Sequence, residues 1–293
     1  MADGKTLLII NPISGGRSKN NFPDMMRANL DEKVFGNLEV AISEYSGHSS
    51  VIAQQAVEDN YTTIIIAGGD GTINEVGSML AGTDVRLGII PCGSGNGLAR
   101  HLKIPLLPVN AFKCINKNKF LRIDAGQVNG RMFFCTSGLG FDAWIGYLFA
   151  TSKTRGFWTY VTTALLEFYR YEPETYEINI NGETRKLTAF LITVANAAQY
   201  GNEAIIAPTA EVTDGKLDFC LLTPFPKFRA AEIGIRLFNR SIDQSIYLTT
   251  KKITEAVIRR QKPGVIHLDG EPMEMGEELK IKIIPSCLNI LVP

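Results

Sequence analysis

The chain has 293 residues, of which 45% are hydrophobic and 20% are charged, and 30 basic and 30 acidic side chains give a formal net charge of zero. This length fits two domains or one large α/β domain, and the apolar content excludes a disordered chain. The neutral balance argues against a nucleic-acid binder held by bulk electrostatics, and the apolar runs are too short to span a membrane.

The first third of the chain alternates short apolar runs with helical patterns. Strands that alternate with helices on short loops indicate βα units and a mostly parallel sheet. The ligands of such sheets bind where strand carboxyl ends meet helix N-termini. We predict strands at Thr6–Ile10, Leu38–Ile42, Thr63–Ala67 and Val85–Ile90, and helices at Asn21–Leu30, Ser49–Glu58 and Ile73–Leu80.

The pattern changes after about Leu121, where short strands are separated by Asn-Gly, Asp-Gly or Pro turns. Asn129-Gly130 and Asn181-Gly182 are strong hairpin signals. Predicted helical insertions lie near Trp158–Tyr169 and Phe228–Leu237. The predicted strands are Arg122–Val128, Met132–Thr136, Tyr176–Ile180, Ala189–Ala195, Leu217–Leu222, Val265–Leu268, Lys280–Ile284 and, at the end of the chain, Leu288–Val292.

These patterns predict two domains. Residues 1–121 would form a mostly parallel, three-layer α/β domain, and residues 122–285 an antiparallel β-sandwich. The last strand, within residues 286–293, can pair in either domain. The N-terminus lacks a secretory signal and the five cysteines are widely spaced, so we expect a cytoplasmic protein with reduced thiols.

Three glycine clusters follow three of the predicted strands of the first domain. They are Asn11–Gly16, Gly68–Thr72 and Gly93–Gly97. Without Cβ atoms the backbone can approach a polyphosphate closely, and the free amides at a helix N-terminus supply hydrogen-bond donors and a positive field. One such cluster alone indicates only a tight βα turn. Three clusters at one edge of the same sheet favour an anion or nucleotide site.

The clusters match neither of two common nucleotide fingerprints. The chain has no Gly-x-x-x-x-Gly-Lys-Ser/Thr sequence, and Leu98 stands where a Gly-x-Gly-x-x-Gly sequence has its third glycine. Asp70 would repel a nucleotide unless a divalent cation or a reacting hydroxyl lies between them. This placement favours magnesium-assisted phosphoryl transfer, with a helix N-cap as the alternative role of Asp70.

The chain contains four notable segments, Asn11-Pro12 with Ser14-Gly15-Gly16, Gly68–Thr72, Pro91–Asn96 and Asp269-Gly270-Glu271-Pro272. Together they resemble the diacylglycerol kinase catalytic-domain family, which includes bacterial lipid kinases, sphingosine kinases and ceramide kinases. NAD kinases share the Gly-Gly-Asp-Gly-Thr run, so the combination of segments carries the resemblance. It implies a nucleotide-binding α/β domain followed by a β-rich domain.

The resemblance also implies roles for individual residues. Glu271 would be the catalytic base for the lipid hydroxyl by similarity to bacterial members, and Asp70 by similarity to sphingosine kinases. A carboxylate suffices because the transition state is loose and the hydroxyl loses its proton late. The nucleotide-binding residues would be Asn11, Ser14, Ser43, Gly68, Gly69, Asp70, Gly71, Thr72, Ile73, Asn74 and Ser94.

The segment from Ala207 to Asp218 resembles the metal-bearing turn of the family. In that turn, Asp214 would offer its carboxylate and Glu211 and Lys216 their backbone carbonyls to a structural Mg²⁺. This ion would be distinct from the Mg²⁺ that accompanies ATP. Without the resemblance, Asp214-Gly215 indicates only a hairpin turn.

Two departures from the family patterns leave the acceptor lipid open. Many bacterial lipid kinases have an acid where this chain has Gly97, and sphingosine kinases have closely spaced acids where this chain has only Asp142. Asp142 is a candidate substrate-binding residue that would pair with a sphingoid amine, and a solvated or capping aspartate is the alternative. The acceptor is therefore diacylglycerol-like or sphingoid-like.

The sequence thus predicts an ATP-dependent lipid kinase of phospholipid biosynthesis that uses Mg²⁺. A NAD-kinase-like dinucleotide kinase and a non-catalytic lipid-binding protein are the alternatives. Because the chain has no evident span or lipidation signal, we expect transient contact with the inner face of a membrane. We expect no nucleic-acid partner, and the oligomeric state stays open.

Overall fold

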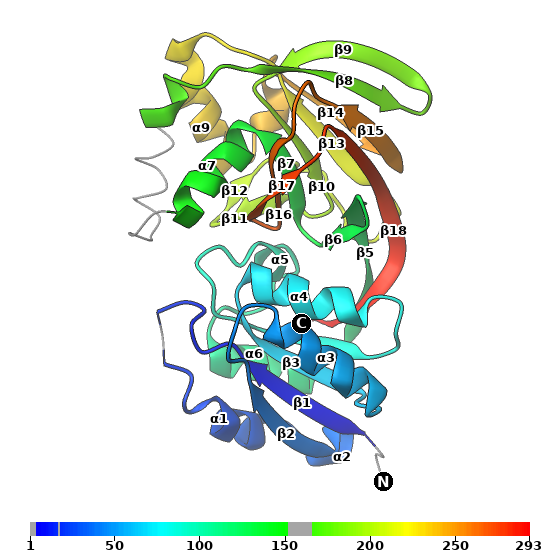
Figure 1. Cartoon of the computed structure of the whole chain (residues 1–293). Helices are drawn as coiled ribbons and strands as arrows, with labels where there is room; N and C mark the ends of the chain where they lie inside the picture. The colour runs from blue at the N-terminus through cyan, green and yellow to red at the C-terminus, as the bar shows by residue number, and fades with distance from the viewer. Residues whose placement is uncertain (1–3, 17, 152–165) are drawn as a thin grey trace. The chain divides into compact units, whose positions relative to one another are not determined.

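The computed structural model describes residues 4–16, 18–151 and 166–293 (Figure 1). The chain divides into two units, of which unit 1 comprises Met1–Ile123 and Ser286–Pro293 and unit 2 comprises Asp124–Pro285. The observed division follows Ile123, whereas the sequence analysis placed it after Leu121. The predicted helix Trp158–Tyr169 lies outside the described residues as far as residue 165.

Unit 1 is built on a parallel sheet with the strand order β2-β1-β3-β4-β18. Strands β1, β3 and β4 are buried along almost their whole length, as their continuous apolar runs require. The chain order reverses between β1 and β3, which makes this pair the topological switch point of the sheet. The strands are β1 (Lys5–Ile10), β2 (Asn37–Ile42), β3 (Thr63–Gly68), β4 (Arg86–Pro91) and the last part of β18 (Glu278–Leu291).

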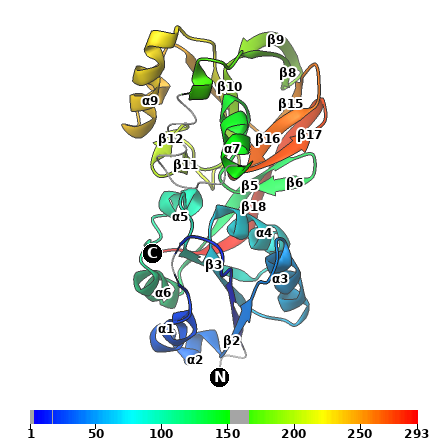
Figure 2. The same cartoon turned by 60° about the vertical axis from the view of Figure 1, so that its left-hand side comes forward.

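Helices cover both faces of this sheet, which confirms the predicted three-layer α/β domain (Figures 1 and 2). Helices α1 (Phe22–Asn29) and α6 (Pro108–Asn116) pack on one face, and α3 (His48–Glu58) and α4 (Asp70–Leu80) cover the other. Two short helices complete the unit, α2 (Glu32–Phe35) and α5 (Gly97–His101).

Unit 2 is an antiparallel β-sandwich, as predicted. Its six-stranded sheet has the order β14-β13-β10-β7-β16-β17, and its second sheet contains β5, β6, β8, β9, β15 and the first part of β18. Alternate residues of the two sheets meet in a core that includes Tyr176, Ile192 and Ile258. The strands are β5 (Phe120–Val128), β6 (Arg131–Phe133), β7 (Thr136–Gly140), β8 (Glu174–Ile180), β9 (Glu183–Ala189), β10 (Leu191–Ala195), β13 (Leu217–Leu222), β14 (Leu248–Ile253), β15 (Glu255–Arg259), β16 (Gly264–Leu268) and β17 (Glu271–Met275).

The outer face of the six-stranded sheet carries the helices of unit 2. Helix α7 packs on β7, β16 and β17, and α9 contributes Ile233 to a second apolar cluster with Leu191 and Leu222. The remaining elements are α7 (Phe141–Thr151), β11 (Gln199–Gly201), β12 (Ala204–Ile205), the 3₁₀ turns η1 (Lys227–Arg229) and η2 (Ile242–Gln244), and α9 (Ala230–Phe238).

Both predicted Asn-Gly hairpins are confirmed. In each, the asparagine and the glycine have positive φ angles and join two strands directly, as a type I′ turn requires. Four predicted strands were wrong in extent. Met132–Thr136 is divided between β6 and β7, and Ala189–Ala195 is divided at Phe190. Lys280–Ile284 and Leu288–Val292 belong to one strand, β18, that continues through Ser286 at a φ of 47°.

Candidate active site

The three glycine clusters lie in contact with one another in unit 1. A Cβ atom on Gly93 would lie 2.7 Å from the Cα atom of Gly69, so the loops after β3 and β4 touch through their backbones. Gly15 has a φ of 60°, and a methyl group there would overlap the carbonyl oxygen of Cys92. The loop after β1 therefore joins the other two. All three lie at the carboxyl edge of the sheet, where doubly wound sheets bind their ligands.

A side-chain hydrogen bond ties the first loop to helix α4. The Nδ2 atom of Asn11 donates to Oγ1 of Thr72 at 3.0 Å, and Oδ1 of Asn11 accepts from the backbone of Ile13 at 3.1 Å. Because Thr72 accepts this bond, its own hydroxyl proton can be donated to a ligand. Asn11 thus positions Thr72 and the loop.

Asn96 closes the third loop. It has a φ of 51°, and its Oδ1 accepts from the backbone of Gly93 at 2.9 Å, while its Nδ2 donates to the carbonyl of Gly93 at 2.7 Å. The Asn96 side chain is buried, whereas Ser94 is exposed on the same loop. Of these two polar side chains, Ser94 is the one that can reach a nucleotide.

Lys19 supports the first loop, and the sequence analysis missed it. Its ammonium group donates to the backbone carbonyls of Ser14 and Pro12, and the residue is buried. Burial lowers the pKa of Lys19, and Cys92 opposes this shift. A basic residue between a glycine cluster and the next helix is the signal that could have identified it.

The other predicted nucleotide-binding residues differ in what they expose. Asp70, Gly71 and Asn74 lie in the first turns of α4 and are partly buried. Ile73 is in the core, so only its backbone could contact a ligand. Ser43 lies after β2, is buried, and is hydrogen-bonded to the carbonyl of Ile10.

The Asp-Gly-Glu segment forms the turn between β16 and β17 in unit 2. The carboxylate of Asp269 accepts hydrogen bonds of 2.8, 2.7 and 3.1 Å from the backbone N–H groups of Phe134, Cys135 and Thr136. These bonds also explain why the chain is not a strand between β6 and β7. Glu271 follows as the exposed first residue of β17. Asp269 therefore holds the turn, and Glu271 is the accessible carboxylate.

Asp142 lies in a buried polar cluster of unit 2. Its Oδ2 accepts from Thr193 Oγ1 at 3.0 Å and from the Tyr200 hydroxyl at 3.1 Å, and it lies 3.3 Å from Nε2 of His267. Its Oδ1 accepts from the backbone of Ala143 at 2.7 Å. The side chain of Asp142 is only 9% exposed and both of its oxygens are engaged, which argues against the solvated aspartate that the sequence allowed.

His267 connects this cluster to the Asp-Gly-Glu turn. Its Nδ1 accepts from the backbone N–H of Gly270 at 3.4 Å, so in the neutral ring Nε2 carries the proton and donates to Asp142. Gly138 lies beneath both side chains, and a Cβ atom there would be 2.5 Å from Nε2 of His267. The cluster thus links α7 to the turn that carries Glu271.

In the predicted metal-bearing turn, the ammonium group of Lys252 occupies the position beside the carboxylates. The Lys252 ammonium lies 2.8 Å from Oδ2 of Asp214 and 2.7 Å from Oδ2 of Asp218, and it donates to the carbonyl of Thr209 at 3.2 Å. The other oxygen of Asp214 accepts from the backbone of Lys216 at 3.0 Å. Both carboxylate oxygens of Asp214 are therefore engaged by donors.

The pKa of Lys252 agrees with this ion pairing. Burial lowers the pKa of Lys252, but the hydrogen bonds and charges of Asp214 and Asp218 outweigh burial and raise it. Burial also raises the pKa of Asp218, and Lys252 opposes that shift. With two carboxylates within 2.8 Å, the ammonium is the stable form of Lys252.

The residues of this turn therefore do not fit a structural Mg²⁺ held by Glu211, Asp214 and Lys216. In residues 4–16, 18–151 and 166–293, no group of three or more His, Cys, Asp or Glu side chains is arranged to hold a metal ion. Asp124, also buried nearby, accepts from the backbone N–H of Gly215 at 2.7 Å. Hydrogen bonds and the Lys252 ion pairs hold the turn.

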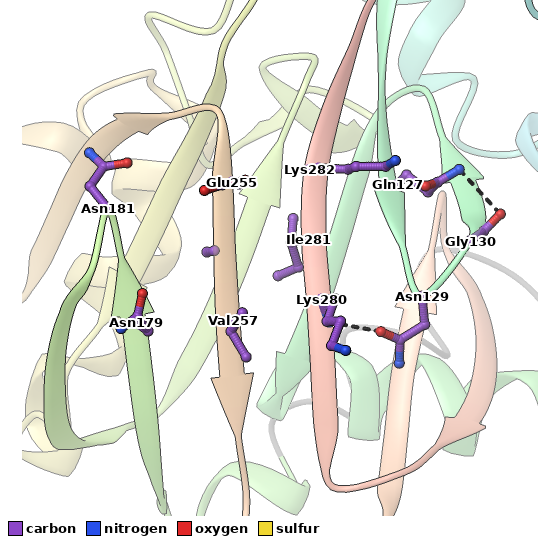
Figure 3. Close-up of a pocket in the computed structure, with 11 residues that line it drawn as sticks. Gln127, Asn129, Gly130, Asn179, Asn181, Glu255, Val257, Lys280, Ile281 and Lys282 are labelled. Atoms are coloured by element: carbon purple, nitrogen blue, oxygen red, sulfur yellow. Dashed lines mark hydrogen bonds between the residues drawn. The ribbon is translucent and has the colours of Figure 1, made fainter.

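An open hollow of about 460 Å³ lies elsewhere in unit 2, on strands of the second sheet (Figure 3). Its lining includes the charged residues Glu255, Lys280 and Lys282 beside apolar ones, and Oδ1 of Asn129 accepts from the backbone N–H of Lys280 across one end. None of the predicted site residues lines it. The hollow is therefore separate from the candidate site.

Two family models cover most of the chain. Residues 5–128 match the diacylglycerol kinase catalytic domain, and residues 136–292 match the YegS C-terminal NAD kinase beta sandwich-like domain. Together with the fold, these matches define the class of protein as a lipid kinase. The chain belongs to the diacylglycerol kinase catalytic-domain family, with a C-terminal domain of the YegS type.

Similar proteins carry names that agree with this family. The chain is 27% identical over 260 residues to a Pseudomonas aeruginosa protein named "Probable lipid kinase YegS-like", with 87% of this chain and 85% of that protein covered. It is 26% identical over 298 residues to a protein of the same name from Chromohalobacter salexigens, with 99% and 94% covered. A crystal structure of a diacylglycerol kinase from Bacillus anthracis shares the fold, with a TM-score of 0.75, 22% identity, and 99% of this chain and 97% of that chain covered.

Membrane-spanning helices are absent from the part of the chain that the structure describes, because no helix there is long and apolar enough to cross a bilayer.

Proposed function

We propose that the protein transfers the γ-phosphate of ATP to a hydroxyl group of a lipid. The contact among the three glycine loops carries this proposal. The backbones of Gly69 and Gly93 are so close that a side chain on Gly93 would not fit, and Gly15 joins them through Cys92. Three such loops at a switch point concentrate backbone N–H donors, as a polyphosphate requires.

Helix α4 supplies the positive end of this nucleotide site. It has 11 residues and begins at Asp70, so the backbone N–H groups of its first turn and the Thr72 hydroxyl can donate to phosphate oxygens. Asp70 at the same position would repel a bare nucleotide. Mg²⁺ held by the phosphates and Asp70 would neutralise this charge and stabilise the transferred phosphoryl group.

Asp70 and Glu271 are the two candidates for the catalytic base. The base accepts the proton of the lipid hydroxyl while that oxygen forms a bond to the γ-phosphorus. The bond between the γ-phosphorus and its bridging oxygen breaks, and ADP leaves with the electron pair. Asp70 belongs to the nucleotide-binding loop of unit 1, and Glu271 is exposed on β17 of unit 2.

The acceptor that we favour is a neutral alcohol of the diacylglycerol type. A sphingoid acceptor would bring an amine for Asp142, but that carboxylate already accepts from Thr193, Tyr200 and the backbone of Ala143 and lies beside His267. An amine would have to replace these buried bonds, which costs their free energy. Diacylglycerol has no amine, so its binding would leave the hydrogen bonds of Asp142 in place.

The test is transfer of labelled γ-phosphate from ATP to diacylglycerol, sphingosine or NAD in detergent micelles, with Mg²⁺ and with a chelator. We expect a Mg²⁺-dependent product from diacylglycerol. General-base catalysis contributes about 10²–10⁴-fold, so Asp70→Asn should lower the rate by about 10³-fold if Asp70 is the base, and Glu271→Gln should do so if Glu271 is the base.

Two matched variants serve as controls. Asp84→Asn removes an exposed carboxylate of unit 1, and Glu274→Gln removes one on the same strand as Glu271. Both should keep the wild-type rate. Label in NAD but not in lipid would replace the proposal with a dinucleotide kinase. If the protein binds lipid but transfers no phosphate, the proposal is replaced by a non-catalytic lipid-binding protein.

A further inference from the structure

Helix α9 and the 3₁₀ turn η1 before it expose apolar side chains at helical spacing. Phe228, Ala231, Ile235 and Phe238 follow one another every three or four residues and are all exposed. Phe228 is 78% and Ile235 is 63% exposed. This spacing places the four on one side of the helical segment. We call them the α9 face.

The other side of α9 is attached to unit 2. Ile233 is buried, and Leu237 packs with it against the apolar cluster that includes Leu191 and Leu222. The helix therefore has one apolar side in the core and a second apolar side in water. Figures 1 and 2 both show α9 on the side of unit 2 opposite β15.

Exposed apolar side chains continue beyond the helix. Ile246, in the loop after η2, is 89% exposed. Tyr169 is also exposed, and the Lys227 ammonium binds its carbonyl at 2.9 Å and lies 5.6 Å from its ring centroid. Aromatic side chains with a polar end suit the boundary between water and lipid.

Basic side chains surround the α9 face. Residues 227–240 contain four basic side chains and one acidic side chain, a net charge of +3 in a chain whose total is zero. The single acid, Glu232, is paired with Arg229 at 2.6 Å and Arg236 at 3.0 Å. An apolar face with a basic rim is the pattern of helices that lie in the interface of an anionic bilayer.

We propose that the α9 face, with Tyr169 beside Lys227 at its start, docks unit 2 on an anionic lipid bilayer. This inference rests on the proposed function, because a kinase for a lipid acceptor must meet its substrate at a membrane. The charge argues against a second copy of the chain as the occupant, since two such faces would bring like charges together.

The experiment measures sedimentation of the protein with vesicles of phosphatidylcholine alone and of phosphatidylcholine with 30% phosphatidylglycerol. We expect the wild type to bind the anionic vesicles, and Phe228→Ser/Ile235→Ser to reduce binding by about tenfold or more. Lys227→Gln/Arg240→Gln should reduce binding to the anionic vesicles and weaken its salt dependence.

The matched control is Val51→Ser/Leu107→Ser, which removes two apolar side chains of unit 1 that are also more than half exposed. It should bind vesicles like the wild type. Equal vesicle binding by the wild type and the α9-face variants overturns the proposal. Concentration-dependent dimers that Phe228→Ser/Ile235→Ser abolishes, with no vesicle binding, also overturn it and assign the face to a second copy.

A second measurement separates this inference from the proposed function. Phosphate transfer is compared for a short-chain diacylglycerol dispersed in solution and for a long-chain diacylglycerol in the anionic vesicles. The α9-face variant should lose about tenfold with the vesicle substrate and keep the wild-type rate with the dispersed one. Equal loss with both substrates overturns docking. Vesicle binding through α9 without any transfer would support docking and contradict the proposed function.

Discussion

The glycine loops of unit 1 and the polar clusters of unit 2 hold their functional groups in different ways. In unit 1, Gly15, Gly69 and Gly93 bring backbone close to backbone, without side chains between. In unit 2, partly buried Asp142 and Asp269 and buried Asp218 accept hydrogen bonds or ion pairs from other parts of the same unit. The loops of unit 1 therefore leave backbone donors that a ligand could use, whereas the carboxylates of these unit 2 clusters are bonded within the unit.

This difference indicates what each residue type contributes. A buried carboxylate is costly unless donors surround it, so removing either partner destabilises the fold. A glycine in a loop contributes little stability, but it leaves space in which a phosphate can meet the backbone. We expect variants of the unit 2 clusters to lose stability and variants of the unit 1 loops to lose activity.

The largest loss of stability is expected for Asp269→Ala. Three backbone N–H groups, of Phe134, Cys135 and Thr136, would lose their charged acceptor, and alanine is strained at the φ of 50°. We expect a loss of about 4 kcal/mol in the free energy of unfolding, measured by urea denaturation. Asp269→Asn is the control. It tolerates this φ and keeps an acceptor oxygen, so its loss should be less than half as large. Equal losses of unfolding free energy for Asp269→Ala and Asp269→Asn would contradict the role of Asp269 as the hydrogen-bond acceptor that holds the turn.

Among the glycines of the three loops, the largest loss of activity with the fold retained is expected for Gly93→Ala. Its Cβ would lie 2.7 Å from the Gly69 Cα atom, so the two loops must separate. A displacement of this kind costs about 10²-fold in rate. The measurements are the initial rate of phosphate transfer and the melting temperature. Gly276→Ala meets no atom within 4 Å and should change neither. Full activity of Gly93→Ala would show that the close approach of these loops is not needed.

Lys252→Met should have a smaller effect on stability. It leaves Asp214 and Asp218 facing each other without the ammonium, at a cost of about 2 kcal/mol because Lys252 is partly exposed. The pKa of Lys252 is raised in the fold, so its contribution is complete below the unfolded pKa of about 10.5 and is lost as the pH rises through the folded pKa.

Urea titrations of the wild type and Lys252→Met at pH 7 and above pH 11 check this pH dependence. The difference in unfolding free energy between the two proteins should shrink at the higher pH. A difference that grows with pH would contradict the ion pairs.

The smallest effect is expected from chelation. Because Lys252 supplies the positive charge beside Asp214, EDTA should shift the melting temperature of the nucleotide-free protein by less than about 1 °C. A large drop, reversed by Mg²⁺, would show that the turn holds a metal after all. The same titration on Lys252→Met shows whether the freed carboxylates then bind Mg²⁺ and regain stability.

Several features of the fold could be predicted from local sequence. The buried strands of unit 1 are continuous apolar runs, and the Asn-Gly turns require the positive φ angles that asparagine and glycine tolerate. The extent of β6, β7 and β18 could not be predicted in this way. Their limits depend on partners distant in sequence, such as Asp269 for the segment Phe134–Thr136.

The sequence by itself determined the fold class, the family and the three glycine clusters, because these depend on local spacing and backbone geometry. Only the tertiary structure decided which side chains meet. It placed Lys19 beneath the first loop, surrounded Asp142 with donors, and brought Lys252 to Asp214 across 38 residues of chain. Local turn signals identify the pairing of strands that are neighbours in the chain, as in the two Asn-Gly hairpins, but contacts between residues distant in sequence leave no such local signal.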